Sequence, residues 1–299
     1  MTKRLHSDDR IQAIYDAISE QTGDTTPMTT AGMAAAILEI SGSDLMELLA
    51  SASETISGTD IIQLTDDTVK TESTVIPTYI GHTKAISKVS FAEVLEVKKY
   101  AFYNAIKLTN VDLPKCTTIG DYAFYNIPYQ EAMDVTLNLP KVKTIGNNAF
   151  DASKVAGTLS LPECETINAN GFANCSKVRG INLPKVKTIG TYAFSLCSIT
   201  ADVDLPLVET IAESAFSRGV NCTNFIIGSN CTSIGSKVFY DSDVVNLYVH
   251  AATPPTFGGN FGYDAHVDHI YVPADSVAAY KAASGWSSFA SIIEAIPAA

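Results

Sequence analysis

Eight phenylalanines recur at a nearly constant spacing between residues 102 and 261 of this chain. Successive members are 22, 26, 22, 22, 22, 23 and 22 residues apart: Phe102, Phe124, Phe150, Phe172, Phe194, Phe216, Phe239 and Phe261. A repeat of this length is typical of a solenoid, in which each rung buries its apolar face against the next rung. We therefore expect an α/β solenoid of about eight rungs over residues 86–270. We do not expect an enzyme, because most positions are committed to packing or display.

The residues of one repeat predict the path of a rung. Ile181 and Leu183 flank Asn182, and this alternation indicates a short strand with apolar side chains inward and a polar one outward. Gly190 is expected at a tight corner, and Phe194 should fill the interior. Strands from successive rungs should then form a parallel sheet on one side of the solenoid, with loops and turns on the other.

Composition limits the class of partner. The chain has 299 residues and a net charge of −12, whereas nucleic acids and anionic lipid surfaces both require a cationic binding face. No stretch approaches the roughly 18 apolar residues of a membrane span. The basic residues near the N-terminus precede no apolar run, so we expect no signal peptide and synthesis in a bacterial cytoplasm. We also expect no membrane insertion and no nucleic-acid partner.

The six cysteines fit the repeat better than they fit a disulfide framework. Cys116, Cys164 and Cys231 each precede a rung isoleucine by three residues, in a slot that other rungs fill with valine. They are therefore expected to act as small buried hydrophobic residues. Cys175 and Cys197 are 22 residues apart and should lie on neighbouring rungs, close enough for a bridge. A reduced pair is our expectation, with a disulfide as the alternative.

The segments outside the repeats predict three further units. Residues 1–40 have the pattern of a hairpin of two short helices. Its apolar seam would be an anchoring interface with a partner: Ile11, Ile14, Ile18, Met33, Ile37 and Ile40. Residues 41–85 are typical of a linker followed by strands that close the N-terminal end of the solenoid. Residues 271–299 are expected to form a C-terminal cap, in which Asp275 caps a helix through Val277, Ala278 and Tyr280.

The repeat resembles a known family, the BspA-like leucine-rich repeats. The resemblance lies in Pro-Lys-Val-Lys-Thr-Ile-Gly-Asn-Asn-Ala-Phe at 140–150, Ile-Gly-Asp-Tyr-Ala-Phe-Tyr-Asn at 119–126 and Phe-Ala-Asn-Cys-Ser at 172–176. It continues from Thr-Pro-Pro-Thr at 253–256 to Tyr-Val-Pro-Ala-Asp-Ser-Val-Ala-Ala-Tyr-Lys-Ala-Ala at 271–283. Family members are mostly surface proteins that adhere to host matrix or to other cells. The resemblance therefore implies binding, with no transferable catalytic residues and no cofactor.

The N-terminal segment has a second resemblance, to a module of tail-associated and minor structural proteins of phages and prophages. It is carried by Asp-Arg-Ile-Gln-Ala-Ile-Tyr-Asp-Ala-Ile-Ser-Glu-Gln-Thr-Gly at 9–23 and Pro-Met-Thr-Thr-Ala-Gly-Met-Ala-Ala-Ala-Ile-Leu-Glu-Ile at 27–40. This resemblance implies a non-enzymatic protein of a tailed phage, located in the virion. The hairpin would bind other virion proteins or a second copy of the chain, and the solenoid would bind a host surface protein or glycan. The alternative is a bacterial cell-surface leucine-rich repeat adhesin.

Two sets of residues are candidates for recognition. The first is a column of small polar residues at the outward strand positions of five rungs: Asp112, Asn138, Ser160, Asn182 and Asp204. Such a column could hydrogen-bond a glycan or a peptide, or it could only prevent aggregation of the sheet. The second set is Tyr125 and Tyr129, beside the four-residue insertion between Phe124 and Phe150. A tolerated surface loop is the alternative for this insertion.

Two charged patterns are expected to be structural. Lysines and glutamates alternate on successive rungs: Lys141, Lys143, Glu163, Glu165, Lys185, Lys187 and Glu209. Alternating charges at strand spacing predict ion-pair ladders that fix the register rather than a nucleic-acid site. Asp264, His266, Asp268 and His269 have a looser spacing than recurring zinc sites, so we expect a solvated loop there and no metal.

Overall fold

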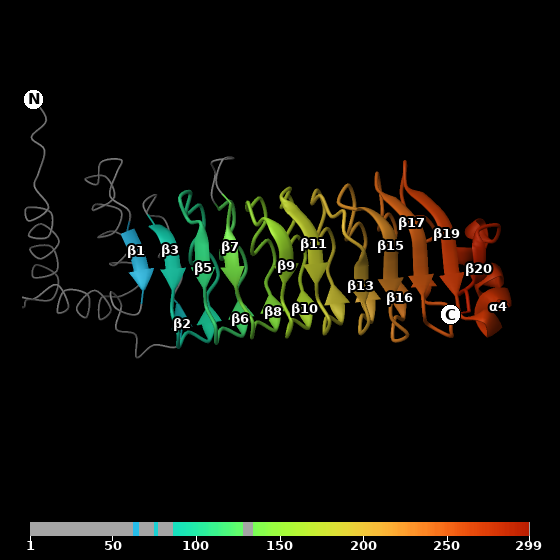
Figure 1. Cartoon of the computed structure of the whole chain (residues 1–299), viewed down its shortest axis with the longest axis horizontal. Helices are drawn as coiled ribbons and strands as arrows, with labels where there is room; N and C mark the ends of the chain where they lie inside the picture. Colours follow the sequence, from blue (N-terminus) through green and yellow to red (C-terminus); the bar gives the residue numbers. More distant parts are fainter. Residues whose placement is uncertain (1–61, 66–74, 77–85, 128–133, 299) are drawn as a thin grey trace, which may run out of the picture.

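Stacked strands build the described part of the chain into a parallel β-solenoid of about nine turns, one for each strand of its nine-stranded sheet (Figure 1). The computed structural model describes residues 62–65, 75–76, 86–127 and 134–298. The hairpin predicted at residues 1–40 lies outside these residues. The strands at 62–65 and 75–76 pair with the strands that follow them, so they add a turn to the eight that the phenylalanines predicted.

One side of the solenoid carries the longer strands, and we call it the long-strand side. These strands pair in parallel in three successive sheets: β1, β3, β5 and β7, then β9 and β11, then β13, β15, β17, β19 and β20. They are β1 (Ile62–Thr65), β3 (Ile86–Ser90), β5 (Asn110–Asp112), β7 (Thr136–Asn138), β9 (Gly157–Ser160), β11 (Val178–Asn182), β13 (Val203–Leu205), β15 (Asn221–Ile227), β17 (Asp243–Val249), β19 (His266–Val272) and β20 (Ile293–Ala295). A parallel bridge between Val135 and Val155 joins the first sheet to the second. Asn182 is exposed between buried Ile181 and Leu183, as their alternation predicted.

A second side of every rung also forms a sheet, so the prediction of strands on one side only was wrong. Its nine strands have two residues each: β2 (Val75–Ile76), β4 (Glu96–Val97), β6 (Thr118–Ile119), β8 (Thr144–Ile145), β10 (Thr166–Ile167), β12 (Thr188–Ile189), β14 (Thr210–Ile211), β16 (Ser233–Ile234) and β18 (Thr256–Phe257). We call this the short-strand side. From β4 to β16 the second residue of each strand is buried. Two residues are too few to show an alternation in the sequence, because period-2 patterning is recognised over longer runs.

The turns around each phenylalanine form a third hydrogen-bonded ladder. In seven rungs the residues two before and two after the phenylalanine have positive φ: Tyr100, Asn104, Tyr122, Asn126, Asn148, Ala152, Asn170, Asn174, Tyr192, Leu196, Ser214, Arg218, Lys237 and Asp241. The N–H of Asn170 donates to the carbonyl of Thr191 at 2.9 Å, and that of Asn174 donates to Ser195 at 2.8 Å. The N–H of Phe172 between them donates to Ala193, so N–H groups at alternate positions of the turn bond to the next rung. These bonds satisfy backbone groups that would otherwise need water.

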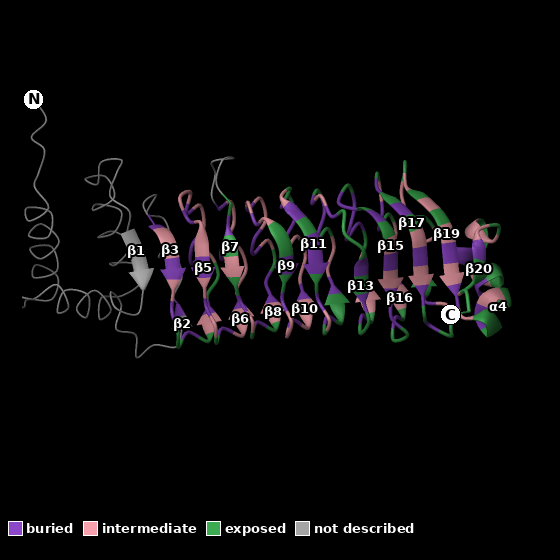
Figure 2. Cartoon of the chain, viewed as in Figure 1, coloured by how far each residue is buried: buried purple, intermediate pink, exposed green. Residues whose placement is uncertain are grey.

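The phenylalanines form the predicted interior column. All eight are buried, and from Phe102 to Phe216 adjacent rings stack with centroids 5.0 to 5.8 Å apart and planes within 13° of parallel. Figure 2 shows buried residues running through the solenoid from turn to turn. Beyond Phe216 the stack tilts, because Phe225 of β15 packs edge-on against Phe216 and Phe239 at 5.0 and 4.9 Å. One aromatic ring per rung therefore forms a continuous column through the core.

Gly190 lies where two rungs approach closely, as the tight corner predicted. A Cβ at this position would lie 2.6 Å from the backbone nitrogen of Ala169 on the preceding rung. The same position in other rungs is also crowded, since a Cβ on Gly120 would lie 2.6 Å from the nitrogen of Lys99. Glycine is therefore selected here by the spacing between rungs rather than by a positive φ.

The cysteines are buried in the slots that the repeat predicted. Cys116, Cys164 and Cys231 are at most 3% exposed. Cys175 and Cys197 are free thiols, so the alternative of a bridge between them does not hold in this structure. Each donates its S–H to the carbonyl of the phenylalanine in the preceding rung, at 3.1 and 3.3 Å respectively. The position three residues after the rung phenylalanine is therefore a donor site, and a sulfur atom can fill it.

The C-terminal end contains one short α-helix instead of the helical cap that we expected. It consists of the 3-10 helix η2 (Ala274–Ser276), α4 (Val277–Ala282), the 3-10 helix η3 (Trp286–Phe289) and strand β20, which pairs with β19. Asp275 caps no helix, because Pro273 precedes η2, Ser276 precedes α4, and neither helix has a side-chain cap. Hydrogen bonds from two buried aromatic side chains connect this segment to the last full rung. Trp286 donates to the carbonyl of Pro255, and Tyr280 donates to that of Ala251, both at 2.8 Å.

Candidate functional site

The predicted polar column lies on the outward face of the long-strand side, and parts of it are internally hydrogen-bonded. Register places Asp112 beside Asn138 and Ser160 beside Asn182. Asn138 donates its amide to the carboxylate of Asp112 at 2.7 Å, and Asn182 donates to the hydroxyl of Ser160 at 3.0 Å. Asp204 stands beside Ile226 instead of a polar residue. The column is thus a set of inter-rung pairs whose outer edges remain exposed.

A second outward column, which the sequence analysis missed, runs parallel to the first. In the C-terminal half it contains Asp202, Asn224, Asn246 and His269. Asp202 accepts bonds from the amide side chain of Asn224 at 2.7 Å and from its backbone N–H at 2.9 Å. Asn246 donates to the side-chain oxygen of Asn224 at 3.0 Å. The spacing of 22 residues from Asp202 to Asn224 to Asn246 was the signal that could have revealed it.

Aromatic rings continue both columns near the C-terminal end. Tyr248 of β17 stacks on Tyr271 of β19, with centroids 5.0 Å apart, and the His269 ring lies 5.7 Å from that of Tyr271. All three side chains are half-buried. The two tyrosine rings stack along the solenoid axis, so each restricts the rotation of the other. This part of the face combines ordered aromatic rings with amide and carboxylate groups.

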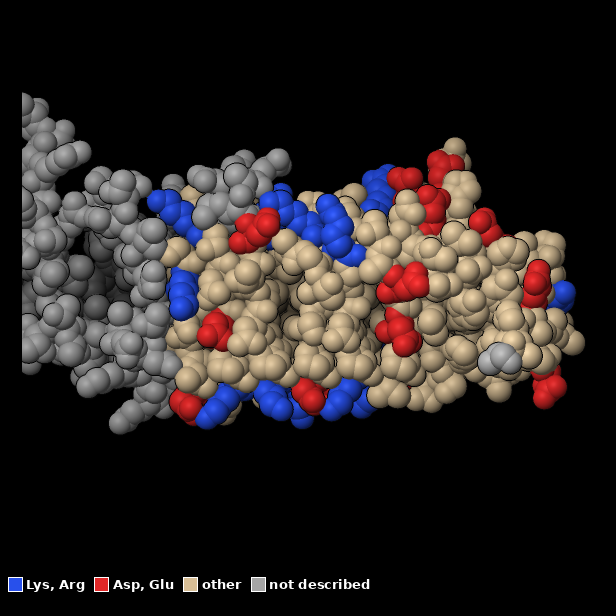
Figure 3. Space-filling model, in the orientation of Figure 1, with Lys and Arg blue, Asp and Glu red and all other residues tan. Residues whose placement is uncertain are grey.

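Charged residues gather at the borders of this face. Figure 3 shows Lys and Arg together with Asp and Glu along its two long edges, while the surface between them is largely uncharged. Two of the predicted ion pairs form, since Lys185 lies 2.7 Å from Glu163 and Lys187 lies 2.9 Å from Glu165. The hydrogen bond from each lysine lowers the pKa of its glutamate. These pairs link adjacent rungs, as an ion-pair ladder should.

Tyr125 belongs to a different part of the surface. It follows Phe124 in the turn and stacks on Tyr103 at 5.0 Å, and Tyr100 stacks on Tyr122 at 5.1 Å. Burial, followed by the charge of Asp151, raises the pKa of Tyr125. The structure therefore places Tyr125 in a cluster of four tyrosines and does not join it to the polar column. Tyr129 lies outside the described residues.

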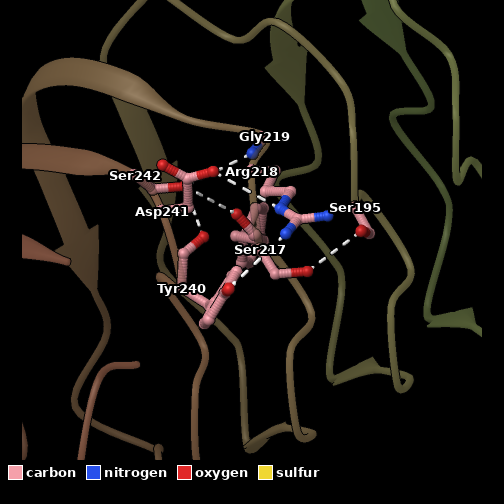
Figure 4. A network of polar contacts seen from close by, with 8 residues as sticks. Ser195, Ser217, Arg218, Gly219, Tyr240, Asp241 and Ser242 are labelled. Carbon is pink, nitrogen blue, oxygen red and sulfur yellow. Dashed lines mark hydrogen bonds and ion pairs between the residues drawn. The ribbon is translucent and has the colours of Figure 1, made fainter. Parts of the chain in front are cut away.

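A polar network ties the turns of three neighbouring rungs together (Figure 4). The Arg218 guanidinium lies 3.4 Å from the carboxylate of Asp241 and 5.0 Å from the centre of the Tyr240 ring. Ser242 donates to the carbonyl of Phe216 at 3.2 Å. Each contact links the turn of one rung to the turn of the next. The network therefore supports the turn ladder, and it contains no arrangement of nucleophile and base.

The segment from Asp264 to His269 is not the solvated loop that we expected, because β19 begins at His266. His266 lies 2.9 Å from Asp243 and His269 lies 3.8 Å from Glu294, so each histidine contacts one carboxylate on a neighbouring strand. Among the described residues, no three His, Cys, Asp or Glu side chains converge in a way that could hold a metal ion. Within the same residues, no helix is long and apolar enough to cross a membrane.

The buried thiols are poorly suited to nucleophilic chemistry. Burial raises the pKa of Cys164, Cys197 and Cys222 to about 12, and that of Cys116 and Cys231 to about 11. A thiol must ionise before it attacks, so these groups are unreactive at neutral pH.

Comparisons with known proteins identify the repeat. A family profile described as BspA type leucine rich repeat region, in six copies, matches residues 74–156 and 143–254. Three chains of solved structures match. One is a leucine-rich repeat protein from Bacteroides ovatus, with 18% sequence identity and a TM-score of 0.48 over 68% of this chain. The chain spans 62% of that protein's length. The comparison with curated proteins found no match.

Proposed function

The chain belongs to the BspA-type leucine-rich repeat family, and on this premise we propose that it is a non-enzymatic recognition protein, similar to a cell-surface adhesin. The outward face of the long-strand side is its binding surface. The observation that carries this proposal is the broad, largely uncharged face of in-register polar side chains between two charged borders (Figure 3). Its amides and hydroxyls present hydrogen-bonding groups on a rigid scaffold, as recognition surfaces do.

Inter-rung hydrogen bonds prepare this face for binding. The pairs between Asn138 and Asp112 and between Asn182 and Ser160 hold the side chains in one conformation before a ligand arrives. Binding then costs less conformational entropy than it would with free side chains. A host surface protein or a glycan fits this chemistry, because both offer many hydrogen-bonding groups.

A pair of substitutions in one rung tests the proposal. Asn182→Lys places a long cation in the centre of the long-strand face, where Asn182 is exposed. Thr188→Lys places the same side chain on the short-strand side, where Thr188 is also exposed. Adhesion of the purified protein to immobilised host cells or to matrix and glycan arrays should be lost in the first variant and kept in the second. Equal adhesion by both variants would assign recognition to another surface.

A second candidate is a virion-associated protein of a tailed phage. It is supported by the resemblance of residues 9–23 and 27–40 to a module of phage structural proteins. In this second candidate function, residues 1–40 bind other virion proteins, and the solenoid binds the host. Deleting residues 1–40 should then abolish incorporation into particles while the solenoid still folds. Mass spectrometry of purified virions decides the matter, since absence of the chain from them would remove this candidate.

A further inference from the structure

The C-terminal part of the outward face differs in charge from the rest of that face. Strands β13, β15, β17, β19 and β20 contain no lysine or arginine. Their outward side, together with the residue before β13, carries five exposed carboxylates: Asp202, Asp204, Asp243, Asp268 and Glu294. The N-terminal part of the same face does carry cations, at Lys88 of β3 and Arg179 of β11. We call the five-strand region the acidic face.

Among the described residues, no lysine or arginine forms an ion pair with any of these five carboxylates. Lysine or arginine pairs with seven other described carboxylates: Glu93, Glu96, Asp134, Glu163, Glu165, Glu213 and Asp241. On the acidic face, the described contacts are with His266, His269 and Asn224 instead. The acidic face therefore has a net negative field, because five carboxylates share five strands that contain no lysine or arginine.

We propose that the acidic face binds a lysine- or arginine-rich segment of a partner protein. This inference rests on the proposed function, because it names the partner for part of the same surface. Charge complementarity selects a cationic occupant and excludes nucleic acid and anionic membranes. Four of the five strands hold these carboxylates at or just before them, since β15 has none. At about 4.8 Å per strand, this spread matches several cations along an extended chain better than a single small ion.

The rings between the carboxylates favour a polypeptide over a free polyamine. Tyr248 and Tyr271 offer hydroxyl groups and ring edges, and Ile226 adds apolar surface in the same outward column. A polypeptide brings peptide groups and side-chain stems that can contact these residues between its cations. A protonated polyamine has no hydrogen-bond acceptor, so it would offer nothing to the tyrosine hydroxyls and the asparagine N–H groups of this face.

The test uses the full-length chain and a fluorescent arginine-rich peptide, with its glutamine-for-arginine counterpart and spermine as comparison ligands. Anisotropy titration should show binding of the arginine-rich peptide that weakens as salt is raised, and no binding of the glutamine peptide. The variant Asp243→Asn/Asp268→Asn/Glu294→Gln should lose roughly tenfold or more in affinity. Its thermal unfolding should be unchanged or occur at higher temperature, because neutralisation relieves repulsion between like charges.

A matched control removes the same number of charges elsewhere. Glu93→Gln/Glu163→Gln/Glu165→Gln changes the net charge equally but alters carboxylates that are paired with lysines. This variant should keep wild-type affinity. Equal losses in the two variants would mean attraction by net charge alone and would overturn the proposal. So would the absence of peptide binding, or spermine binding as tightly as the peptide.

A charge reversal keeps the proposal testable if the neutralised variant folds poorly. Asp243→Lys/Asp268→Lys/Glu294→Lys should bind a glutamate-rich peptide and reject the arginine-rich one. Failure of that exchange would also overturn the acidic-face assignment. Adhesion measured on the same variants separates the two proposals. If a variant loses peptide binding but keeps adhesion, the proposal of a cationic partner is wrong and the proposed function stands. If only Asn182→Lys loses adhesion, the proposed function stands and the adhesive site lies outside the acidic face.

Discussion

Each rung places one phenylalanine in a site shaped by the phenylalanines before and after it. Phe172 is fully buried and stacks on Phe150 at 5.0 Å and on Phe194 at 5.8 Å. Its removal would therefore leave a cavity bordered by rings on neighbouring rungs, and the backbone ladders on three sides would prevent those rungs from closing the gap. Interior positions of this kind set the stability of the solenoid more strongly than its surface pairs do.

We predict that Phe172→Ala lowers the free energy of unfolding by about 3–5 kcal/mol. Urea denaturation followed by circular dichroism measures this change. Tyr263→Ala is the control, because Tyr263 is 74% exposed and its truncation should cost within about 0.5 kcal/mol. A loss below about 1 kcal/mol for Phe172→Ala would mean that the ring column is not the main packing unit.

The buried cysteines make the stability of the solenoid depend on pH. Cys164 occupies a slot that holds Val142 and Val186 in adjacent rungs, and burial raises its pKa from the ordinary 9.0 to about 12. A raised folded-state pKa means that the contribution to stability is complete below pH 9.0 and is lost as the pH rises toward about 12. The folded protein should therefore become less stable at alkaline pH.

We predict that Cys164→Val changes the free energy of unfolding at neutral pH by less than about 1 kcal/mol and reduces its loss at alkaline pH. Denaturation curves across the alkaline range measure both effects. Cys197→Val is the matched comparison and should cost more at neutral pH, because the S–H of Cys197 makes the shorter hydrogen bond, 3.3 Å to the Phe172 carbonyl against 3.5 Å from Cys164 to the Thr166 carbonyl. If the free energy of unfolding of Cys164→Val fell with alkaline pH as steeply as that of the wild type, the role assigned to the burial of Cys164 would be wrong.

At the scale of the element, the two-residue strands of the short-strand side hold the rungs together. The N–H of Thr188 in β12 donates to the carbonyl of Glu165 at 3.2 Å, and the Cα register continues to β10 and β14. Each strand is too short to be stable alone, so it depends on both neighbours. The outward residue is a β-branched threonine in six of the nine strands, which suits this extended conformation.

Thr188→Pro is predicted to destabilise the protein by about 3 kcal/mol or more, because it removes an N–H from the middle of a nine-stranded sheet. Thr188→Val keeps the N–H and the branched shape, and it should be close to neutral. Thermal unfolding of the two variants provides the measurement. Similar melting temperatures would show that the short strands contribute little to the register.

Element length also explains what sequence reasoning missed at the candidate site. The strands β15, β17 and β19 have seven residues, long enough for two outward positions that are two residues apart, such as Asn224 and Ile226. A pattern that assigns one outward residue per rung finds Asp204 but not Asp202, which lies two positions earlier in the same alternation, just before β13 begins. The same two-residue spacing brings His269 beside Tyr271.

At the scale of the whole molecule, the solenoid is a one-dimensional array in which each rung contacts mainly its neighbours. Removal of a complete repeat should therefore be tolerated if the residues joined by the deletion occupy consecutive positions of the repeat. Residues 173–194 form such a unit, since their deletion joins Phe172 to Ser195 at the same point of the repeat.

We predict that deleting residues 173–194 leaves a cooperatively folded protein shortened by about 4.8 Å along its axis. Small-angle scattering and circular dichroism measure the length and the strand content. Deleting residues 184–194 removes half a rung, which would place apolar residues outside and polar residues inside. This control should not fold, and a folded product would contradict the fixed phase of the array.

The N-terminal hairpin, and with it the phage version of the function, stays a prediction, because residues 1–40 lie outside the described part of the chain. The C-terminal end shows the limits of local patterns. Aspartate is a common helix-capping residue, but Asp275 caps no helix here. The path of the chain is instead held by the Tyr280 hydroxyl and the Trp286 indole N–H, which are buried and donate to carbonyls of the last full rung. These contacts join residues about thirty positions apart, and no local rule predicts them.

The sequence by itself determined the period of the array, the column of phenylalanines, the buried cysteine slots and the charge ladder. These features depend only on which residue occupies the same place in successive rungs, and that information is written in the spacing. The tertiary structure alone decided the second sheet, the left-handed turns on both sides of each phenylalanine and the acidic face. Those features depend on the path of the backbone between the repeated positions, and this path is set by hydrogen bonds to the neighbouring rung rather than by the residues within one rung.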